Sequence, residues 1–278
     1  VDKWNILLDE LRMAESENYK GIIILHGTDT LAYTACLLSL VMGEKGLPVC
    51  LVSSHSPIEF EGTNANINFR AAVELIMNGI APNVYAVYRN GDGVLYTHYG
   101  AHLLQCANYS DDFFSADAMV VPDADNACLP GKPFETTGFY LKQMQPLTSC
   151  VLHLVPYVGI DYDAYNLEGF RAVVHGTYHS ESVCVERKEG KGAYGSKSVL
   201  HLIDRCEERG IQVFLAPCSP AAYKYESTGD ALKHVAAHIC GMTREMAYAK
   251  TLVGCALGLA GEALKSFVNQ NVNHEVVY

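Results

Sequence analysis

The chain has 278 residues, of which 49% are hydrophobic and 18% charged, and its formal net charge is −11. This is the composition of a globular protein, and the length favours two domains. An acidic chain is poorly suited to nucleic acid or to an anionic membrane surface. No apolar run approaches the ~20 residues of a transmembrane helix, so we expect no membrane span.

The first third of the chain alternates between helix and strand patterns. An amphipathic helix pattern, unlike a signal peptide, opens the chain. Short β-branched runs then alternate with longer helical patterns closed by Gly and Pro. This β-α-β-α-β order favours a parallel sheet with right-handed crossovers. The predicted strands are 21–25, 48–54 and 84–89, and the predicted helices are 1–15, 31–45 and 64–77.

Residues 90–145 are less regular and rich in Gly, Asp, Asn and Pro, which is typical of a hairpin, loops and a domain boundary. A second alternation begins at 150–158. It continues through strand, helix and strand patterns at 170–176, 196–210 and 211–217, with helices after Asp230. The prediction is an α/β protein. A parallel, doubly wound domain at 1–145 is followed by a smaller α/β domain at 146–278.

Three polar turns follow predicted strands: HGTDT (26–30), SSHS (53–56) and HGTYHSES (175–182). Ligands of open α/β sheets bind outside the carboxyl ends of the strands, so these turns are candidate site segments. Thr28, Asp29 and Thr30 lie where a strand turns into a helix, and the backbone N–H groups there favour an anionic group. The alternative is that Asp29 or Thr30 merely caps the helix.

Three stretches carry a family resemblance. GIIILHGTDTLAYTA (21–35) resembles a signature of L-asparaginases. PVCLVSSHSPIEFEGTNANINFRAA (48–72) is similar to the strand, serine turn and helix of that family. YESTGDALKHVAAHICGMTREMAYAK (225–250) resembles its closing segment. The matches occur in the family's order, and they resemble the cytoplasmic type I branch more than the secreted one.

The resemblance implies roles for several residues. In such enzymes a Thr of a TGGT motif attacks the side-chain amide, and a second Thr acts with the next Asp and a distant Lys. The second Thr and the Asp correspond to Thr28 and Asp29, and Asp29 is also expected to bind the substrate's α-amino group. Ser54 matches a position that lines the site.

The chain departs from the family pattern in three places. It contains no TGGT motif, so we expect the sequence to be incomplete at its start. It has no Lys between Lys45 and Lys132, and Gly100 or His102 stands where the family has its catalytic Lys. His102 is the candidate replacement for this Lys as a base. Glu181 aligns near the position of an Asn that, in the family, contributes to a neighbouring subunit's site. It is either a candidate substrate contact or a surface charge.

The hypothesis from sequence is an amidohydrolase that converts L-asparagine or a related small amide to the acid plus ammonia. Two alternatives remain: an impaired homologue that binds a small amino acid, and the asparaginase-like subunit of a tRNA-dependent amidotransferase. The resemblance implies a homodimer or homotetramer without a cofactor. Ten scattered cysteines without a CxxC motif favour reduced thiols and a cytoplasmic location.

Histidines four residues apart raise the question of a metal. Of these pairs, His234 and His238 lie on a predicted helix, where such spacing can hold zinc. No HExxH motif or Cys cluster accompanies them, so we predict no metal.

Overall fold

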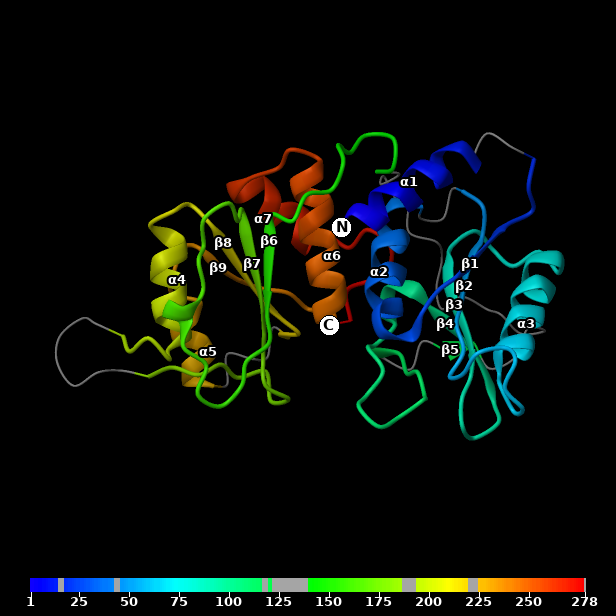
Figure 1. Ribbon diagram of the computed structural model, residues 1–278. Coiled ribbons are helices and arrows are strands. Elements are labelled where there is room, and N and C mark those ends of the chain that lie inside the picture. The colour runs from blue at the N-terminus through cyan, green and yellow to red at the C-terminus, as the bar shows by residue number, and fades with distance from the viewer. Residues whose placement is uncertain are drawn as a thin grey trace. The chain divides into compact units, whose positions relative to one another are not determined.

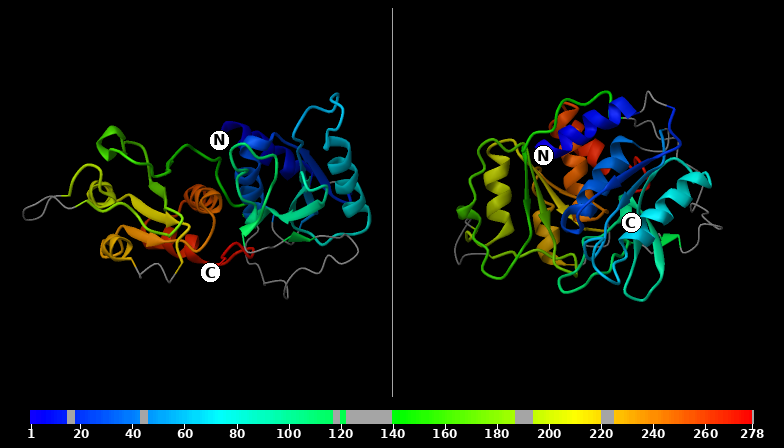
Figure 2. Two further views of the ribbon diagram at one scale, coloured as in Figure 1. Left: turned by 90° about the horizontal axis from the view of Figure 1, so that it is seen from below. Right: turned by 45° about the vertical axis from the view of Figure 1, so that its right-hand side comes forward.

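The computed structural model describes residues 1–14, 18–42, 46–116, 120–121, 140–186, 194–219 and 225–277. The chain forms two compact units (Figures 1 and 2). Unit 1 comprises Val1–Met144 together with Asn271–Val277, and unit 2 comprises Gln145–Gln270. The strand and helix pattern gives no indication that the C-terminal segment groups with unit 1. Within the described residues, no helix is long and apolar enough to cross a bilayer.

Unit 1 is built on a five-stranded sheet in the order β1-β2-β3-β4-β5. The first three strands are parallel, and β4 and β5 are antiparallel to their neighbours. The mixed α/β class is therefore confirmed. The strands are β1 Ile22–Leu25, β2 Val49–Val52, β3 Val84–Arg89, β4 Leu95–Tyr99 and β5 Val120–Val121. The helices are α1 Asp2–Ala14, α2 Leu31–Val41 and α3 Ala65–Met77, with short 3-10 turns η1 Thr28–Thr30 and η2 Gly100–His102.

The two crossover helices of unit 1 lie on opposite faces of the sheet (Figure 1). Tyr85 packs with Ala72 in the cluster beneath α3, whereas Val84, the preceding residue, faces Ser39 of α2 at Gly100. Successive strand residues point to opposite faces. Because β1, β2 and β3 are parallel and in sequential order, helices on opposite faces require crossovers of opposite hand. One crossover is therefore left-handed, and the prediction that both are right-handed is wrong.

Unit 2 contains a four-stranded, wholly parallel sheet in the order β6-β7-β8-β9. In Figure 1, α4 lies on one side of this sheet and α6 on the other. The strands are β6 Val151–Leu154, β7 Ala172–Gly176, β8 Gln212–Ala216 and β9 Ala237–Ile239. The helices are α4 Val199–Glu207, α5 Glu226–Ala231, α6 Arg244–Ala256 and α7 Gly261–Asn269, with the 3-10 turn η5 Tyr162–Ala164.

The prediction that His234 and His238 lie on one helix is wrong. His234 lies in a turn after α5, and His238 lies in β9. β9 pairs in parallel with β8, with Ala237 opposite Val213. A three-residue strand is too short for its alternation to stand out from a helical period, so the pairing with β8 decides its conformation.

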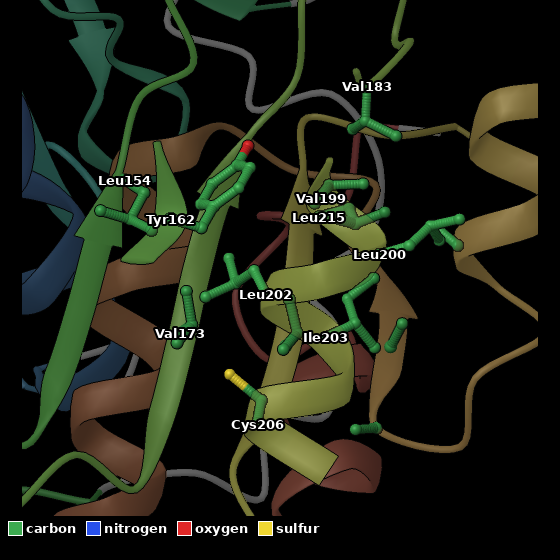
Figure 3. Close-up of a cluster of buried hydrophobic side chains, with 14 of the residues drawn as sticks. Leu154, Tyr162, Val173, Val183, Val199, Leu200, Leu202, Ile203, Cys206 and Leu215 are labelled. Carbon is green, nitrogen blue, oxygen red and sulfur yellow. The ribbon is translucent and has the colours of Figure 1, made fainter. Parts of the chain in front are cut away.

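The core of unit 2 lies between α4 and the sheet (Figure 3). Ser198 caps α4 by accepting the Leu200 N–H, and the apolar residues of α4 recur on one face. Figure 3 shows this face, including Leu202 and Cys206, against the strand residues Val173 and Leu215. Each fully buried aliphatic side chain of this kind contributes about 1.5–3 kcal/mol.

Candidate active site

A polar cavity of about 290 Å³ lies at the carboxyl ends of β1, β2 and β3. The turn after β1 and the turn after β2 both contribute to it, and a loop that follows η2 forms another wall. This is the edge of a parallel sheet at which ligands are expected. The lining residues are Thr28, Asp29, His55, Tyr88, Gln105, Cys106, Ala107, Asn108, Ser110, Asp111 and Phe113.

Thr28 and Asp29 form the wall contributed by η1, directly after β1. The Thr28 side chain is half-buried and Asp29 is exposed. Neither the Thr28 hydroxyl nor the Asp29 carboxylate bonds to another group in the described part of the chain. Thr30, at the N-cap of α2, makes no capping bond with its side chain either. Capping therefore does not explain these residues, and the hydroxyl and the carboxylate stay available to a ligand.

The turn that carries Thr28 is held from behind by a chain of hydrogen bonds. The Trp4 indole N–H donates to Thr34 Oγ1 at 2.9 Å, and Thr34 Oγ1 lies 2.8 Å from His26 Nε2. His26 Nδ1 lies 2.6 Å from the Gly27 carbonyl oxygen. Because a carbonyl oxygen can only accept, Nδ1 carries the ring proton and Nε2 accepts from Thr34. His26 thus fixes the peptide that precedes Thr28.

Another wall of the cavity, formed by Gln105 and Tyr88, offers buried polar atoms to a ligand. Gln105 donates from Nε2 to the Asp29 carbonyl oxygen, which ties this wall to η1. Its Oε1 is buried and has no hydrogen-bond partner within the described residues, and the Tyr88 hydroxyl is buried near the Asn64 side chain. Tyr88 is held edge-on against Phe113, with ring centroids 4.9 Å apart. A buried polar atom without a partner is costly, so this wall is suited to water or to a polar ligand.

Cys106 lines the cavity but is not a plausible nucleophile. Its Sγ lies 2.9 Å from the Ser110 carbonyl oxygen and 3.3 Å from that of Asp112. Burial and then the negative charges of Asp111 and Asp112 raise the pKa of the Cys106 thiol. A thiol held in its neutral form is weakly nucleophilic.

Ser54 lies in the same turn as His55 but lines a different cavity. This second cavity, of about 510 Å³, runs beside β1 and is lined mainly by apolar side chains such as Leu25 and Phe69. The Ser54 hydroxyl donates to the Ser56 carbonyl oxygen at 2.8 Å. The turn contributes His55 to the polar cavity instead.

His102 does not line the polar cavity. The side chain is 2% exposed. Its Nδ1 lies 3.2 Å from the Ala116 carbonyl oxygen, and its Nε2 contacts the His274 carbonyl oxygen. Both ring nitrogens are engaged by backbone oxygens, so His102 has no free nitrogen with which to take a proton from a ligand.

Glu181 lies in unit 2, in a tight turn with a backbone φ of 61°. Its carboxylate accepts from the Ser219 backbone N–H at 2.8 Å and from the Ser219 hydroxyl at 2.5 Å. Thr228 Oγ1 donates to the Glu181 carbonyl oxygen at 3.0 Å. These bonds hold an otherwise unfavourable left-handed conformation and give Glu181 a structural role within its unit.

Residues that the sequence analysis did not single out make up much of the cavity. His55 lies in a turn that the sequence did indicate, one residue beyond Ser54. Tyr88 lies at the end of β3, a position that the strand pattern could have suggested. Gln105 and Asp111 come from an irregular loop, where no periodicity points to their positions.

The fold and the cavity define an α/β protein with a small, acidic candidate ligand site at the carboxyl edge of its N-terminal sheet. The family model for the N-terminal domain of asparaginases matches residues 1–116. An L-asparaginase of Thermococcus kodakarensis is 36% identical over 100 residues, which are 34% of this chain and 30% of that protein. Residues 1–116 are therefore similar to the N-terminal domain of asparaginases.

A second kind of relative also matches the chain. The glutamyl-tRNA(Gln) amidotransferase of Pyrobaculum aerophilum has a subunit that is 26% identical over 115 residues, or 41% of this chain and 28% of that protein. The sequence matches to these relatives thus span about a third of their length or less.

The fold similarity extends over the whole chain. The thermostable L-asparaginase of Thermococcus kodakarensis superposes with a TM-score of 0.76 at 21% identity, covering 99% of this chain and 81% of that one. L-asparaginase I of Vibrio cholerae gives a TM-score of 0.69 at 22% identity, with the same coverage. At this identity the likeness concerns the fold.

Proposed function

We propose that the protein is an L-asparaginase-like amidohydrolase that converts L-asparagine or a related small amide to the acid plus ammonia. The observation that carries the proposal is the pair Thr28 and Asp29, with unbonded side chains in a polar cavity of an asparaginase-family domain. We further propose that the protein is cytoplasmic and that it forms a homodimer or homotetramer. Light scattering on the purified chain would test the number of subunits.

The charges of the cavity favour an amino acid as the ligand. Asp29 and Asp111 supply negative charge for an α-ammonium group, and Gln105 Oε1 supplies an acceptor beside them. Backbone N–H groups at the start of η1 and α2 can receive the α-carboxylate. The volume of about 290 Å³ is at the small end of the range for ligand sites, which suits one amino acid.

Amide hydrolysis needs a nucleophile, a proton carrier and water. The family resemblance gives the attack to a TGGT threonine, which this sequence does not contain, and we propose that Thr28 makes the attack instead. Its hydroxyl oxygen attacks the amide carbonyl carbon while the C–N bond breaks and ammonia leaves with the hydroxyl proton. Water then attacks the ester and restores the hydroxyl. His55 is the imidazole in the described lining and is our candidate for the general base, in place of His102.

An ammonia-release assay on L-asparagine and L-glutamine tests the proposal. Thr28→Ala and Asp29→Asn should each lower kcat/KM by at least about 100-fold, because members of a catalytic group act as a unit. Thr30→Ala is the matched control, since Thr30 neither lines the cavity nor makes a capping bond. The proposal fails if the unmodified chain binds an amino acid by calorimetry without releasing ammonia, which would support an amino-acid-binding protein instead.

The amidotransferase relatives favour a second candidate, the asparaginase-like subunit of a tRNA-dependent amidotransferase. Such a subunit needs a partner protein. Ammonia release from glutamine that appears only when a partner and charged tRNA are added would support this second candidate, whereas turnover by the chain alone would exclude it.

A further inference from the structure

Two carboxylates and an imidazole converge on the surface of unit 2, apart from the candidate active site. Asp204 and Glu207 are three residues apart on α4, so they share one face of the helix. His234 reaches them from the turn that follows α5. One ligand atom from each of the three residues lies within 4.8 Å of the other two. We propose that these residues bind a divalent transition-metal ion of the zinc type, which links α4 to the turn preceding β9.

The spacing of the ligand atoms suits a tetrahedral ion. His234 Nδ1 lies 3.2 Å from Asp204 Oδ1 and 3.5 Å from Glu207 Oε2. Nitrogen and oxygen ligands at ~2.0–2.2 Å from Zn²⁺ are about 3.3–3.6 Å apart in a tetrahedron. The three side chains can therefore take three corners with small movements, and water takes the fourth.

A neighbouring pair shows how an ordinary imidazole–carboxylate contact looks in the same unit. His201 Nε2 lies 2.7 Å from Asp163 Oδ1, the length of a charge-assisted hydrogen bond. His234 Nδ1 lies further from each of its two carboxylates, so neither contact reaches that length. The geometry resembles a ligand set more than a closed ion pair.

Neighbouring groups hold the ligands in place. Glu207 Oε1 accepts the Val235 N–H at 3.1 Å, which directs Oε2 toward His234. The Tyr194 ring packs edge-on against the imidazole, with centroids 6.2 Å apart. Lys233, the adjacent cation, is engaged by Asp230 at 2.6 Å.

The donor set selects the ion. An imidazole nitrogen with two carboxylates suits Zn²⁺, Co²⁺ or Ni²⁺, whereas Ca²⁺ and Mg²⁺ prefer sets made of oxygen alone. The site is structural, because it joins two elements of unit 2. The site is independent of the proposed hydrolase activity. It implies that each chain binds one metal ion, in contrast to the prediction from sequence that the chain binds none.

Calorimetric titration of the chelator-treated full chain with ZnCl₂ tests the proposal, under reducing conditions. We expect one equivalent to bind with a micromolar or lower Kd and to raise Tm. His234→Gln and Asp204→Asn should each weaken this binding at least 10-fold and abolish the rise in Tm. His201→Gln is the matched control and should bind like the unmodified chain.

Titration with Co²⁺ supplies a second readout, because a tetrahedral N/O site gives visible absorption that octahedral hydrated Co²⁺ lacks at comparable intensity. This absorption should be lost in His234→Gln while the far-UV circular dichroism is unchanged. The proposal is overturned if the unmodified chain takes up no Zn²⁺ at micromolar concentration, or if His234→Gln binds the ion as tightly as the control. Binding through cysteine thiols would appear as that second outcome.

Discussion

Gly100 occupies the position where the family resemblance implies a Lys, and the structure gives a packing reason for the glycine. The residue opens η2, against which α2 packs. A Cβ built at Gly100 would lie 2.7 Å from Ser39 Oγ, 2.9 Å from Val84 Cγ1 and 3.1 Å from the Ala35 carbonyl oxygen. Comfortable contacts are at about 3.5–4.0 Å. Any side chain here must therefore push α2 and β3 away by a good fraction of an ångström.

The predicted effect of Gly100→Ala is a loss of stability in unit 1. Overpacking of this kind costs about 1–3 kcal/mol, and we expect the upper half of that range because one clashing atom belongs to the backbone. With a urea m-value of about 2 kcal/mol/M, the unfolding midpoint falls by about 1 M. Gly100→Lys should cost more than Gly100→Ala and should not raise the rate of ammonia release.

Trp4 fluorescence can follow the unfolding of unit 1, because Trp4 is the single tryptophan of the chain and its indole donates to Thr34 in α2. Gly27→Ala is the control, since a Cβ there would meet nothing within 4 Å. Ser39→Ala removes the nearest clashing atom, so the double variant with Gly100→Ala should regain part of the loss. Equal midpoints for Gly100→Ala and Gly27→Ala would refute the packing argument.

Two further predictions concern ionisable side chains. Burial lowers the pKa of His98 to about 4 from 6.5, so the imidazole is neutral in the folded state, whereas the unfolded chain takes up a proton below about pH 6.5. Stability should therefore fall as the pH drops from 7 to 4, by up to about 3 kcal/mol, and His98→Gln should flatten that slope in urea titrations. Glu181→Ala leaves the Ser219 N–H without its acceptor and should cost about 1–3 kcal/mol, whereas Ser219→Ala should cost less; equal costs in thermal unfolding would contradict the role of the backbone bond.

The sequence predicted what depends on local pattern. The strand VYAVYR was predicted at 84–89 and is observed there. A β-branched and aromatic run bounded by turn residues indicates a strand from local pattern alone. α2 ends at Val41, and the predicted end at Lys45 lies outside the described residues. The strand β9 was missed, since Ala237–Ile239 becomes a strand through its pairing with β8. Features that depend on long-range pairing leave little trace in a single sequence.

The same distinction holds for the site. Thr28 and Asp29 could be found from a motif, because strand, turn and helix follow one another in the chain. Gln105 could not, because it reaches the Asp29 carbonyl oxygen across 76 positions. His102 was proposed from its position along the chain alone, and its contacts with the Ala116 and His274 carbonyl oxygens depend on segments that sequence position does not bring together.

The location of the cavity follows from the hand of the crossovers. In an open α/β sheet a crevice forms at the carboxyl edge where the connections from two adjacent strands leave toward opposite faces. This change of face between adjacent connections, the topological switch point, usually arises from a reversal of strand order. In unit 1, however, the order β1-β2-β3 does not reverse. The chain leaves β1 for α2 on one face and leaves β2 for α3 on the other, so the left-handed crossover creates the switch. This places a crevice at the carboxyl ends of these strands, where Thr28, Asp29 and His55 line the cavity.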